Sequence, residues 1–284
     1  MTMQGKCVVV TGGTDGIGKV TAIELAKLGA KITLIGRNAE KCAGVVRELD
    51  GVGRGTGADY VECDLSSMKS IEVAAQLLKG RLSSIDVLIN NAGAMFQKRC
   101  LSADGTEMTF ALNHMGYFAL TARLIDVLRA APHGRIVSVA SAAHLGARLN
   151  LDDLQNEKKY SGWSAYGQSK LANVYFTYEL ARRLQGSTVT ANCLHPGFVA
   201  SAFGNNNGGW LRFAIELAKR TMAISQSDGA MTSIHLATSP DVAQANGKYF
   251  DKCAEAKSSA ISHDVDVAKG LWKRSEELSG LTFK

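Results

Sequence analysis

Short apolar segments alternate along this chain with longer segments in which apolar residues recur every three or four positions. The short segments are typical of buried strands, and the longer ones of helices that pack along one face. The predicted strands cover residues 6–11, 31–35, 58–63, 85–89, 135–140, 188–194 and 247–250. Because tight turns join strand to helix in regular alternation, the pattern predicts an α/β fold, a doubly wound parallel sheet of about seven strands with helices on both faces.

Three segments need a separate interpretation. Residues 142–162 are polar and irregular. Residues 202–221 begin with a flexible Asn- and Gly-rich stretch and continue as an apolar helix, so we expect a flap over a binding crevice or, alternatively, a plain surface helical hairpin. One long helix is predicted over 105–130, with Asn113 near its middle. That amide is either a neutral surface group or a group that frees a backbone carbonyl by kinking the helix.

Composition adds limits to this fold. Three prolines, no linker and no repeat in 284 residues favour a single domain over 1–284, with its dinucleotide-binding part over about 1–140. The net charge of +6 comes without a dense basic run, which argues against nucleic acid and suits an anionic small molecule at least as well. Six scattered cysteines without metal-ligand spacing predict no metal site and a reduced, cytoplasmic protein. No leader is visible, and no segment approaches the ~20 apolar residues of a membrane span.

A glycine-rich turn, GGTDGIG, lies between the first predicted strand and the first helix. Glycines at such a place let the backbone turn sharply and approach a pyrophosphate, while the helix N-terminus offers unpaired N–H groups. The spacing is G-x-x-x-G-x-G, and its strand–turn–helix context favours nucleotide binding. The residues expected to bind the cofactor here are Gly12, Thr14, Asp15, Gly16, Ile17 and Gly18.

The end of the second strand predicts which dinucleotide is bound. An acid at this place accepts the ribose 2′-hydroxyl of NAD, whereas a basic residue accommodates the 2′-phosphate of NADP. Here Gly36 is followed by Arg37, with Lys41 one helical turn further on, so NADP(H) is favoured. The alternative is a solvated arginine that begins a helix. Asp15 argues mildly the other way, because its charge lies near the expected phosphate.

Polar residues also follow the third and fourth strands. Asp64 is placed to cap the next helix, to accept a hydrogen bond from the adenine amine, or both. Asn91, Ala92 and Gly93 end the fourth strand with an amide that can tie loops together and small residues that leave room for a ligand. Leu65 belongs to the same predicted cofactor wall.

The segment SGWSAYGQSKLANV, over 161–174, carries the candidate chemistry. Tyr166 and Lys170 are four residues apart, so they project from one face of the predicted helix. A nearby cation favours the phenolate and should bring the tyrosine pKa, ordinarily ~10, toward working pH. Ser141 ends the fifth strand, at the sheet edge where ligands gather in such folds. An isolated pair of this kind is more often an ordinary surface Tyr and Lys, so the rest of the chain decides.

Taken in order, TGGTDGIG, Asp64, NNAG, Asn113, Ser141, YGQSK and HPGFV resemble the short-chain dehydrogenase/reductase family over nearly the whole chain. The long interval between Ser141 and Tyr166, YGQSKLANV, GKYF and LWKRSEEL resemble its retinol dehydrogenase-like branch. The chain departs from that branch in lacking an N-terminal apolar anchor. It also reads VASAAH where many relatives have two adjacent serines.

The resemblance implies a single-domain Rossmann fold and hydride transfer between a nicotinamide dinucleotide and a carbonyl or alcohol. It implies that Tyr166 supplies the proton, Ser141 positions the carbonyl oxygen, Lys170 also holds the nicotinamide ribose, and Asn113 anchors a relay water through its backbone. It extends the cofactor site to Pro196, Gly197, Val199 and Ser201, the last beside the carboxamide. His195 is expected to shape a loop or contact the cofactor rather than act as a base.

The substrate and the partners are less defined. The apolar residues of the 202–221 segment, Trp210, Leu211, Phe213 and Ile215, favour a lipophilic carbonyl or alcohol. Relatives pair through the helices that carry Asn113 and Tyr166, which suggests a homodimer or homotetramer. Two alternatives are an NADP(H)-sensing regulatory protein, which has no need of Ser141, Tyr166 and Lys170 together, and a nucleotide-sugar epimerase or dehydratase, which usually has a larger C-terminal domain.

Overall fold

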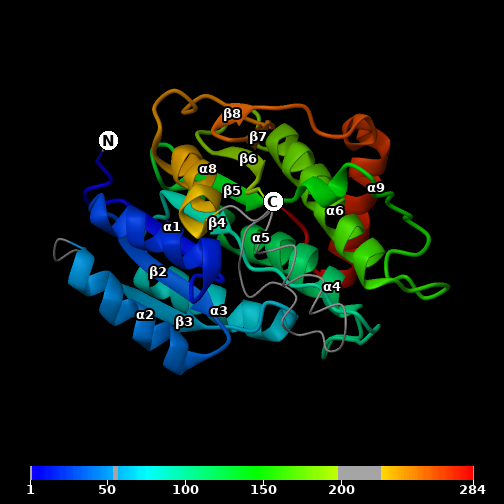
Figure 1. Ribbon diagram of the computed structural model, residues 1–284, viewed down its shortest axis with the longest axis horizontal. Coiled ribbons are helices and arrows are strands. Elements are labelled where there is room, and N and C mark those ends of the chain that lie inside the picture. The colour runs from blue at the N-terminus through cyan, green and yellow to red at the C-terminus, as the bar shows by residue number, and fades with distance from the viewer. Residues whose placement is uncertain (1, 54–56, 198–224, 284) are drawn as a thin grey trace.

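The computed structural model describes residues 2–53, 57–197 and 225–283 (Figure 1). These residues contain one sheet with the strand order β3-β2-β1-β4-β5-β6-β7-β8. The strands are β1 (Cys7–Thr11), β2 (Lys31–Gly36), β3 (Asp59–Glu62), β4 (Val87–Asn90), β5 (Arg135–Val139), β6 (Thr190–His195), β7 (Tyr249–Asp251) and β8 (Ala254–Glu255). Strands β1 to β7 are parallel, which confirms the doubly wound sheet.

The eighth strand was not predicted from the sequence. It pairs antiparallel with β7 through a tight hairpin whose residues Lys252 and Cys253 both have positive φ, 48° and 63°. Glycine or asparagine usually fills such positions. Their absence, and a strand of only two exposed residues, leave no signal in the hydrophobic pattern.

The helices lie on both faces of the sheet (Figure 1). They are α1 (Gly16–Lys27), α2 (Ala39–Val52), α3 (Met68–Arg81), α4 (Met108–Phe110), η1 (Ala111–Met115), α5 (Gly116–Arg129), η2 (Ala142–His144), α6 (Gly162–Arg183), α8 (Gln226–Thr238), η3 (Ala260–His263) and α9 (Val265–Ser279). Helices α1, α2 and α8 pack in one core, and α3, α5 and α6 in the other, with Trp272 of α9 joining the second.

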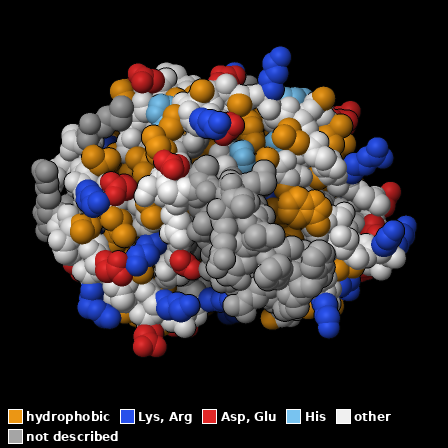
Figure 2. Space-filling model, in the orientation of Figure 1, with side chains coloured by type: hydrophobic (Ala, Val, Ile, Leu, Met, Phe, Trp, Pro, Cys, Tyr) orange, Lys and Arg blue, Asp and Glu red, His pale blue; other side chains and the backbone are white. Residues whose placement is uncertain are grey.

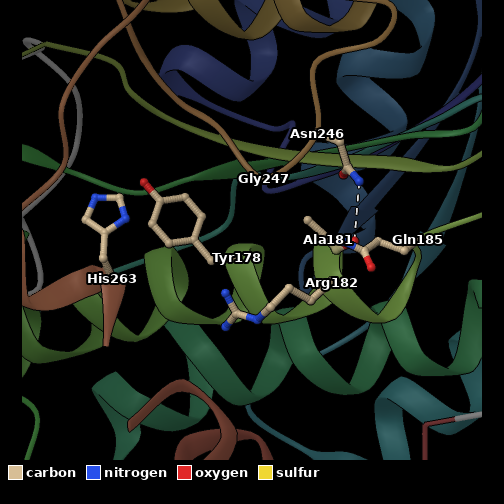
Figure 3. A pocket seen from close by; sticks show the side chains of 7 residues that line it. All are labelled: Tyr178, Ala181, Arg182, Gln185, Asn246, Gly247 and His263. Carbon is tan, nitrogen blue, oxygen red and sulfur yellow. Dashed lines mark hydrogen bonds between the residues drawn. The ribbon is translucent and has the colours of Figure 1, made fainter. Parts of the chain in front are cut away.

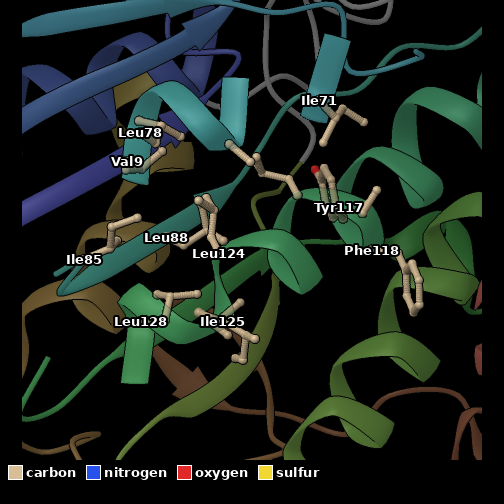
Figure 4. Packing of buried hydrophobic residues seen from close by; sticks show 14 of the residues in the cluster. Val9, Ile71, Leu78, Ile85, Leu88, Tyr117, Phe118, Leu124, Ile125 and Leu128 are labelled. Atoms are coloured by element: carbon tan, nitrogen blue, oxygen red, sulfur yellow. The ribbon is translucent and has the colours of Figure 1, made fainter. Parts of the chain in front are cut away.

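The two cores follow from the alternation of side chains along each strand. In β1, Val8 and Val10 belong to the core under α1, whereas Val9 belongs to the core under α3 and α5. Figure 4 shows Val9 and Leu88 packed with residues of these helices, such as Leu78 and Leu124. Because both faces of the sheet are covered, its strands read as continuous apolar runs, which is why they were visible in the sequence.

The helix predicted over 105–130 is different in the structure. It begins only at Met108, after Glu107 caps it by accepting hydrogen bonds from the N–H groups of Thr109 (2.9 Å) and Phe110 (2.8 Å). Residues 111–115 form a π-helical turn, and α5 continues from Gly116. The prediction of one regular helix was therefore wrong. Nearly all residues over 109–121 are buried, so the apolar pattern does not reveal the extra residue of a π turn. Asn113 lies in that turn and is fully buried, which excludes the surface alternative.

Other sequence-based expectations concern the surface and the cysteines. On the face in Figure 2, acidic and basic side chains are interspersed, in line with the absence of a dense basic run. All six cysteines are free. Within the described ranges, no helix has both the length and the apolarity to cross a membrane, and no cluster of metal-ligating side chains occurs. The flap predicted over 202–221 lies outside the described residues.

Candidate active site

The predicted site residues come together at the carboxyl edge of the sheet. Strands β1, β4, β5 and β6 are consecutive neighbours, and each is followed directly by predicted site residues. Gly12 follows β1, Asn91 follows β4, Ser141 lies just after β5, and Pro196 follows β6. The topology therefore collects groups from four distant parts of the sequence at one edge.

The glycine turn is tightly packed. Gly12 and Gly16 have positive φ, 63° and 56°, a region that L side chains rarely adopt. A Cβ atom at Gly12 would lie 2.9 Å from the Cα atom of Ala92, and one at Gly18 would overlap the Asn91 amide and the Gly12 carbonyl. These glycines are thus required by the turn itself. Asp15 caps α1 by accepting a 2.7 Å hydrogen bond from the Gly16 N–H, while Thr14 and Ile17 are half-buried beside it.

A buried threonine, which was not predicted from the sequence, joins this turn to the loop after β4. The Thr11 hydroxyl accepts hydrogen bonds from the N–H groups of Asn91 (2.8 Å) and Ala92 (3.0 Å). The Asn91 side chain donates in turn to the carbonyls of Thr11 (2.9 Å) and Gly12 (3.2 Å). A hydroxyl as the last residue of an otherwise aliphatic strand was the available signal, because a buried hydroxyl needs partners.

Asp64 does not cap the next helix. Ser67 is the N-cap of α3. The Asp64 carboxylate instead accepts hydrogen bonds from the N–H (2.9 Å) and hydroxyl (2.7 Å) of Ser66 and remains exposed. The capping interpretation was wrong because the chain makes a turn between Asp64 and the helix. Leu65 is buried, with its carbonyl 2.7 Å from where a Cβ atom at Gly116 would lie.

Ser141, Tyr166 and Lys170 form one cluster. The Ser141 side chain is hydrogen-bonded to the Tyr166 phenol and also accepts the Ala143 N–H at 3.2 Å. One turn further along α6, the Lys170 ammonium donates to the Val139 carbonyl at 2.9 Å and lies 5.7 Å from the Tyr166 ring centroid. Gly93 faces this amine, since a Cβ atom there would lie 3.3 Å from Lys170 Nζ. The serine, the phenol and the amine are therefore held in place by α6 and β5.

Burial changes the acidity of this cluster. It raises the pKa of Tyr166 to about 12, although the hydrogen bond from Ser141 acts in the opposite direction. It lowers the pKa of Lys170 to about 7, because Lys170 is only 3% exposed. The expectation that the lysine brings the phenol toward working pH was wrong for the protein alone. Desolvation outweighs the attraction of a cation that is itself only partly charged near neutral pH.

Asn113 clamps the loop after β4 onto α6. Its side-chain oxygen accepts the Ala94 N–H at 2.9 Å, and its amide donates to the Ala94 carbonyl and to the Ser169 hydroxyl, both at 2.9 Å. Ser169 in turn donates to the Tyr166 carbonyl at 2.8 Å. The amide thus positions two segments of the site directly, a role that the sequence did not predict. The relay water expected at its backbone stays a prediction.

Two neutral histidines hold the segment after Ser141. His144 Nε2 accepts the Ser259 N–H at 3.1 Å, so Nδ1 carries the proton and donates to the Ser141 carbonyl. His195 Nδ1 accepts the Ala142 N–H at 3.1 Å. Burial lowers the pKa of both rings. His195 therefore has the loop-shaping role expected for it, whereas His144 was missed because nothing in its spacing distinguishes it.

The predicted phosphate-binding residues are exposed. Arg37 and Lys41 lie at the start of α2, where the Asn38 side chain caps the helix by accepting the Lys41 N–H at 2.8 Å. Among the described residues, Arg37 has no hydrogen-bond or ion-pair partner. Pro196 and Gly197 are half-buried after β6. Val199 and Ser201 lie outside the described residues.

A cavity of about 230 Å³ lies elsewhere, toward the end of α6 (Figure 3). It is lined by Tyr178, Ala181, Arg182, Gln185, Asn246, Gly247 and His263. Tyr178 is more than three helical turns from Tyr166 along α6, and none of the predicted site residues contributes to the cavity. It is not part of the candidate active site.

Comparison with known proteins places this arrangement in a family. Residues 6–211 match the model of the short chain dehydrogenase family. Human retinol dehydrogenase 13 is 40% identical over 99% of this chain and 86% of its own length, and human polyprenol dehydrogenase is 39% identical over 96% and 84%.

Two solved structures have folds similar to that of this chain. A Mycobacterium paratuberculosis protein of unstated function has a TM-score of 0.81 and 32% identity, covering 100% of this chain and 96% of its own. The Pseudomonas aeruginosa RhlG/NADP active-site complex has a TM-score of 0.71 and 26% identity, covering 88% and 95%. The chain belongs to the short-chain dehydrogenase/reductase family of oxidoreductases, in its retinol dehydrogenase-like branch.

Proposed function

We propose that this protein is an NADPH-linked reductase of carbonyl compounds, reversible to alcohol oxidation, that acts on a lipophilic substrate. The observation that carries the proposal is the buried cluster of Ser141, Tyr166 and Lys170 at the sheet edge next to the glycine turn. A protein that only sensed a dinucleotide would not need this cluster.

The residues present fit a dinucleotide. The tightly packed glycine turn leads into the N-terminus of α1, whose N–H groups favour a phosphate. Lys170 Nζ is buried with one backbone acceptor, so its other N–H groups suit ribose hydroxyls beside Gly93. Thr14, Asp15, Ile17, Asp64, Leu65 and Asn91 complete the proposed wall. When bound, the nicotinamide supplies or accepts the hydride.

The chain's own groups then handle the proton. With its pKa raised to about 12, Tyr166 is a protonated phenol, the form that can donate to a carbonyl oxygen gaining charge. The Ser141 hydroxyl, already bonded to that phenol, is placed to position the same oxygen. As Tyr166 loses its proton, the charged form of Lys170 stabilises the phenolate, because Lys170 Nζ lies 5.7 Å from the centroid of the same ring. The acid and its charge support are thus fixed before substrate arrives.

Cofactor and substrate preferences rest on separate observations. Arg37 and Lys41 offer two exposed cations at the predicted 2′-phosphate position, and the similar RhlG structure is an NADP complex. The names of the relatives, retinol dehydrogenase and polyprenol dehydrogenase, refer to lipophilic alcohols. The epimerase alternative has no support among these comparisons.

Oligomeric state and location stay predictions. The structure argues against pairing through the helices that carry Asn113 and Tyr166. Residues from Ala165 to Ala181 of α6 are already buried within the single chain and offer no surface to a second copy. Helix α9 packs against the same helix. The support for a cytoplasmic location is the set of six free cysteines, which is typical of a reducing compartment.

The proposal is tested by NADPH oxidation against a panel of retinal, aliphatic aldehydes, aromatic ketones and quinones, with Tyr166→Phe as the decisive variant. We expect turnover to fall by about 1,000-fold or more while NADPH still binds, because the proton donor alone is lost. Tyr60→Phe, on the distant strand β3, is the matched control and should behave as wild type. Turnover by Tyr166→Phe at the wild-type rate, or dinucleotide that cycles without net consumption, would contradict the proposal.

A further inference from the structure

Trp163 is the most exposed large hydrophobic side chain among the described residues, at 63%. It lies in the first turn of α6. It belongs to none of the four apolar clusters formed by the described residues. Other aromatic side chains of the same helix, such as Tyr175 and Phe176, are 2% exposed. The indole is therefore not explained by the packing of the fold.

The indole lies beside the proposed proton donor. The ring centroids of Trp163 and Tyr166 are 6.2 Å apart, with an interplanar angle of 38°. Helical side chains lean toward the N-terminus, so the phenol leans toward the indole one turn before it. Tyr166 itself is 9% exposed, so the indole presents a broad apolar surface next to a nearly buried phenol.

The backbone under Trp163 is fixed. A Cβ atom at Gly162 would lie 2.5 Å from the Phe96 carbonyl oxygen and 3.0 Å from the Cα atom of Gln97, so the start of α6 packs directly on the loop after β4. A second exposed apolar side chain, Leu145 at 57%, follows the segment that the neutral His144 ties to Ser141. Each segment that carries a catalytic group thus has an exposed apolar side chain close to that group, Leu145 after Ser141 and Trp163 before Tyr166.

We propose that Trp163 is a specificity-determining residue, whose indole forms the apolar platform on which the carbonyl substrate rests as it reaches Tyr166. A flat aromatic surface of this kind favours a conjugated or aromatic chain next to the carbonyl, because such a chain can stack on it while burying apolar area. It disfavours short or polyhydroxylated carbonyl compounds. This inference rests on the proposed function and names the substrate class of the same site.

The test compares two enals that share the reacting group and differ in the length of the conjugated chain, all-trans-retinal and trans-2-hexenal. In the full-length protein with NADPH, Trp163→Ala should lower kcat/KM for retinal about tenfold, mainly through KM, and change hexenal less than about twofold. Trp163→Phe should retain most of the retinal activity, because it keeps an aromatic face. Met231→Ala removes another exposed apolar side chain, on α8, and should change neither.

A second measurement separates this inference from the proposed function. The Kd of retinol, followed by its own fluorescence without turnover, should rise about tenfold in Trp163→Ala. If the wild type reduces no carbonyl, the proposed function is wrong, and this Kd still decides the role of the indole. Equal losses for both enals, or an unchanged retinol Kd, overturn the inference, whatever the activity.

Discussion

The two ends of the proposed cofactor site differ in how much of each is built by the protein alone. At the catalytic end, Tyr166 and Lys170 are 9% and 3% exposed and are held by defined hydrogen bonds. At the adenosine end, Arg37 and Lys41 are exposed at the start of α2. One end is a buried network, and the other offers charge that solvent still screens.

This contrast separates what residue identity determines from what burial determines. Arg37 is cationic wherever it lies, so its contribution to phosphate binding depends on position alone. Lys170 has a pKa of about 7 only because the fold removes it from water. Substitutions at the catalytic end should therefore change proton transfer and stability together, whereas those at the adenosine end should change only cofactor affinity. Single substitutions at each end test this division, beginning with the largest effect.

After the loss of the proton donor in Tyr166→Phe, replacing Lys170 should give the largest loss of activity. In Lys170→Met, the phenolate formed during reduction loses its nearby cation, and the proposed ribose donor disappears. We expect kcat/KM to fall by about 100-fold or more, with a raised KM for NADPH. Lys69→Met, at an exposed lysine on α3, is the control and should behave as wild type. A loss below about threefold would show that the catalytic end does not depend on this amine.

The same substitution should stabilise the protein without cofactor. Lys170 titrates at about 7 when folded and at its ordinary 10.5 when unfolded, so between these values the unfolded chain holds the additional proton. The free energy of unfolding of the wild type should therefore rise with pH in this window. Below about pH 7 the full cost of burying the cation is present. Lys170→Met should be the more stable protein at pH 7, and the difference should shrink by pH 8.5.

Thermal unfolding at pH 7 and pH 8.5 measures this difference. Comparing the two proteins at each pH cancels the titration of the other buried groups. If Lys170→Met is less stable than wild type at pH 7, the amine is not under a desolvation cost, and the catalytic end is more open to water than its 3% exposure indicates.

The same distinction, between what residue identity determines and what burial determines, explains which features of the two ends could be predicted from the sequence. The sheet could be predicted because its strands are buried on both faces. Tyr166, Lys170 and Arg37 were proposed from spacing and position, and the structure brings Tyr166 and Lys170 together with Ser141. The direction of the Tyr166 pKa shift could not be predicted from the sequence, because it depends on desolvation, which only the packed structure defines. The helix cap after β3 likewise depends on the turn that Asp64 makes with Ser66.

Asn113 shows the same limit in its clearest form. It lies in a buried π turn, from which its side chain bonds Ala94. A π turn has one residue more than a regular α-helical turn, and the spacing of apolar residues in the sequence does not show this extra residue. His144 carries no signal in spacing, since its partners, Ser141 and Ser259, are joined only by the fold. Long-range partners of this kind have to be read from the structure.

The next largest effect is expected from the clamp. Asn113→Ala leaves the N–H and carbonyl of Ala94 without their side-chain partner and removes the donor to the Ser169 hydroxyl, which keeps its bond to the Tyr166 carbonyl. A buried unsatisfied group costs about 1–3 kcal/mol. We expect a loss of stability in this range and a fall of about tenfold in kcat, measured by denaturant unfolding and steady-state kinetics. Asn173→Ala, at an equally buried position on α6, is the matched control and should lose less activity. If both variants lose equal activity, the hydrogen bonds of Asn113 contribute no more to catalysis than the packing of any buried side chain.

Arg37→Ala should have the smallest effect, and it tests the exposed end directly. Because the guanidinium is solvated, its removal should cost on the order of 1 kcal/mol of NADPH affinity, which raises the NADPH KM about fivefold and leaves NADH and kcat almost unchanged. Arg47→Ala, at an exposed arginine within α2, should change the KM of neither cofactor. Stability should remain that of wild type, in contrast to the substitutions at the buried end. An unchanged ratio of NADPH to NADH efficiency would assign the preference to residues other than Arg37, and a loss of kcat would show that the two ends are coupled.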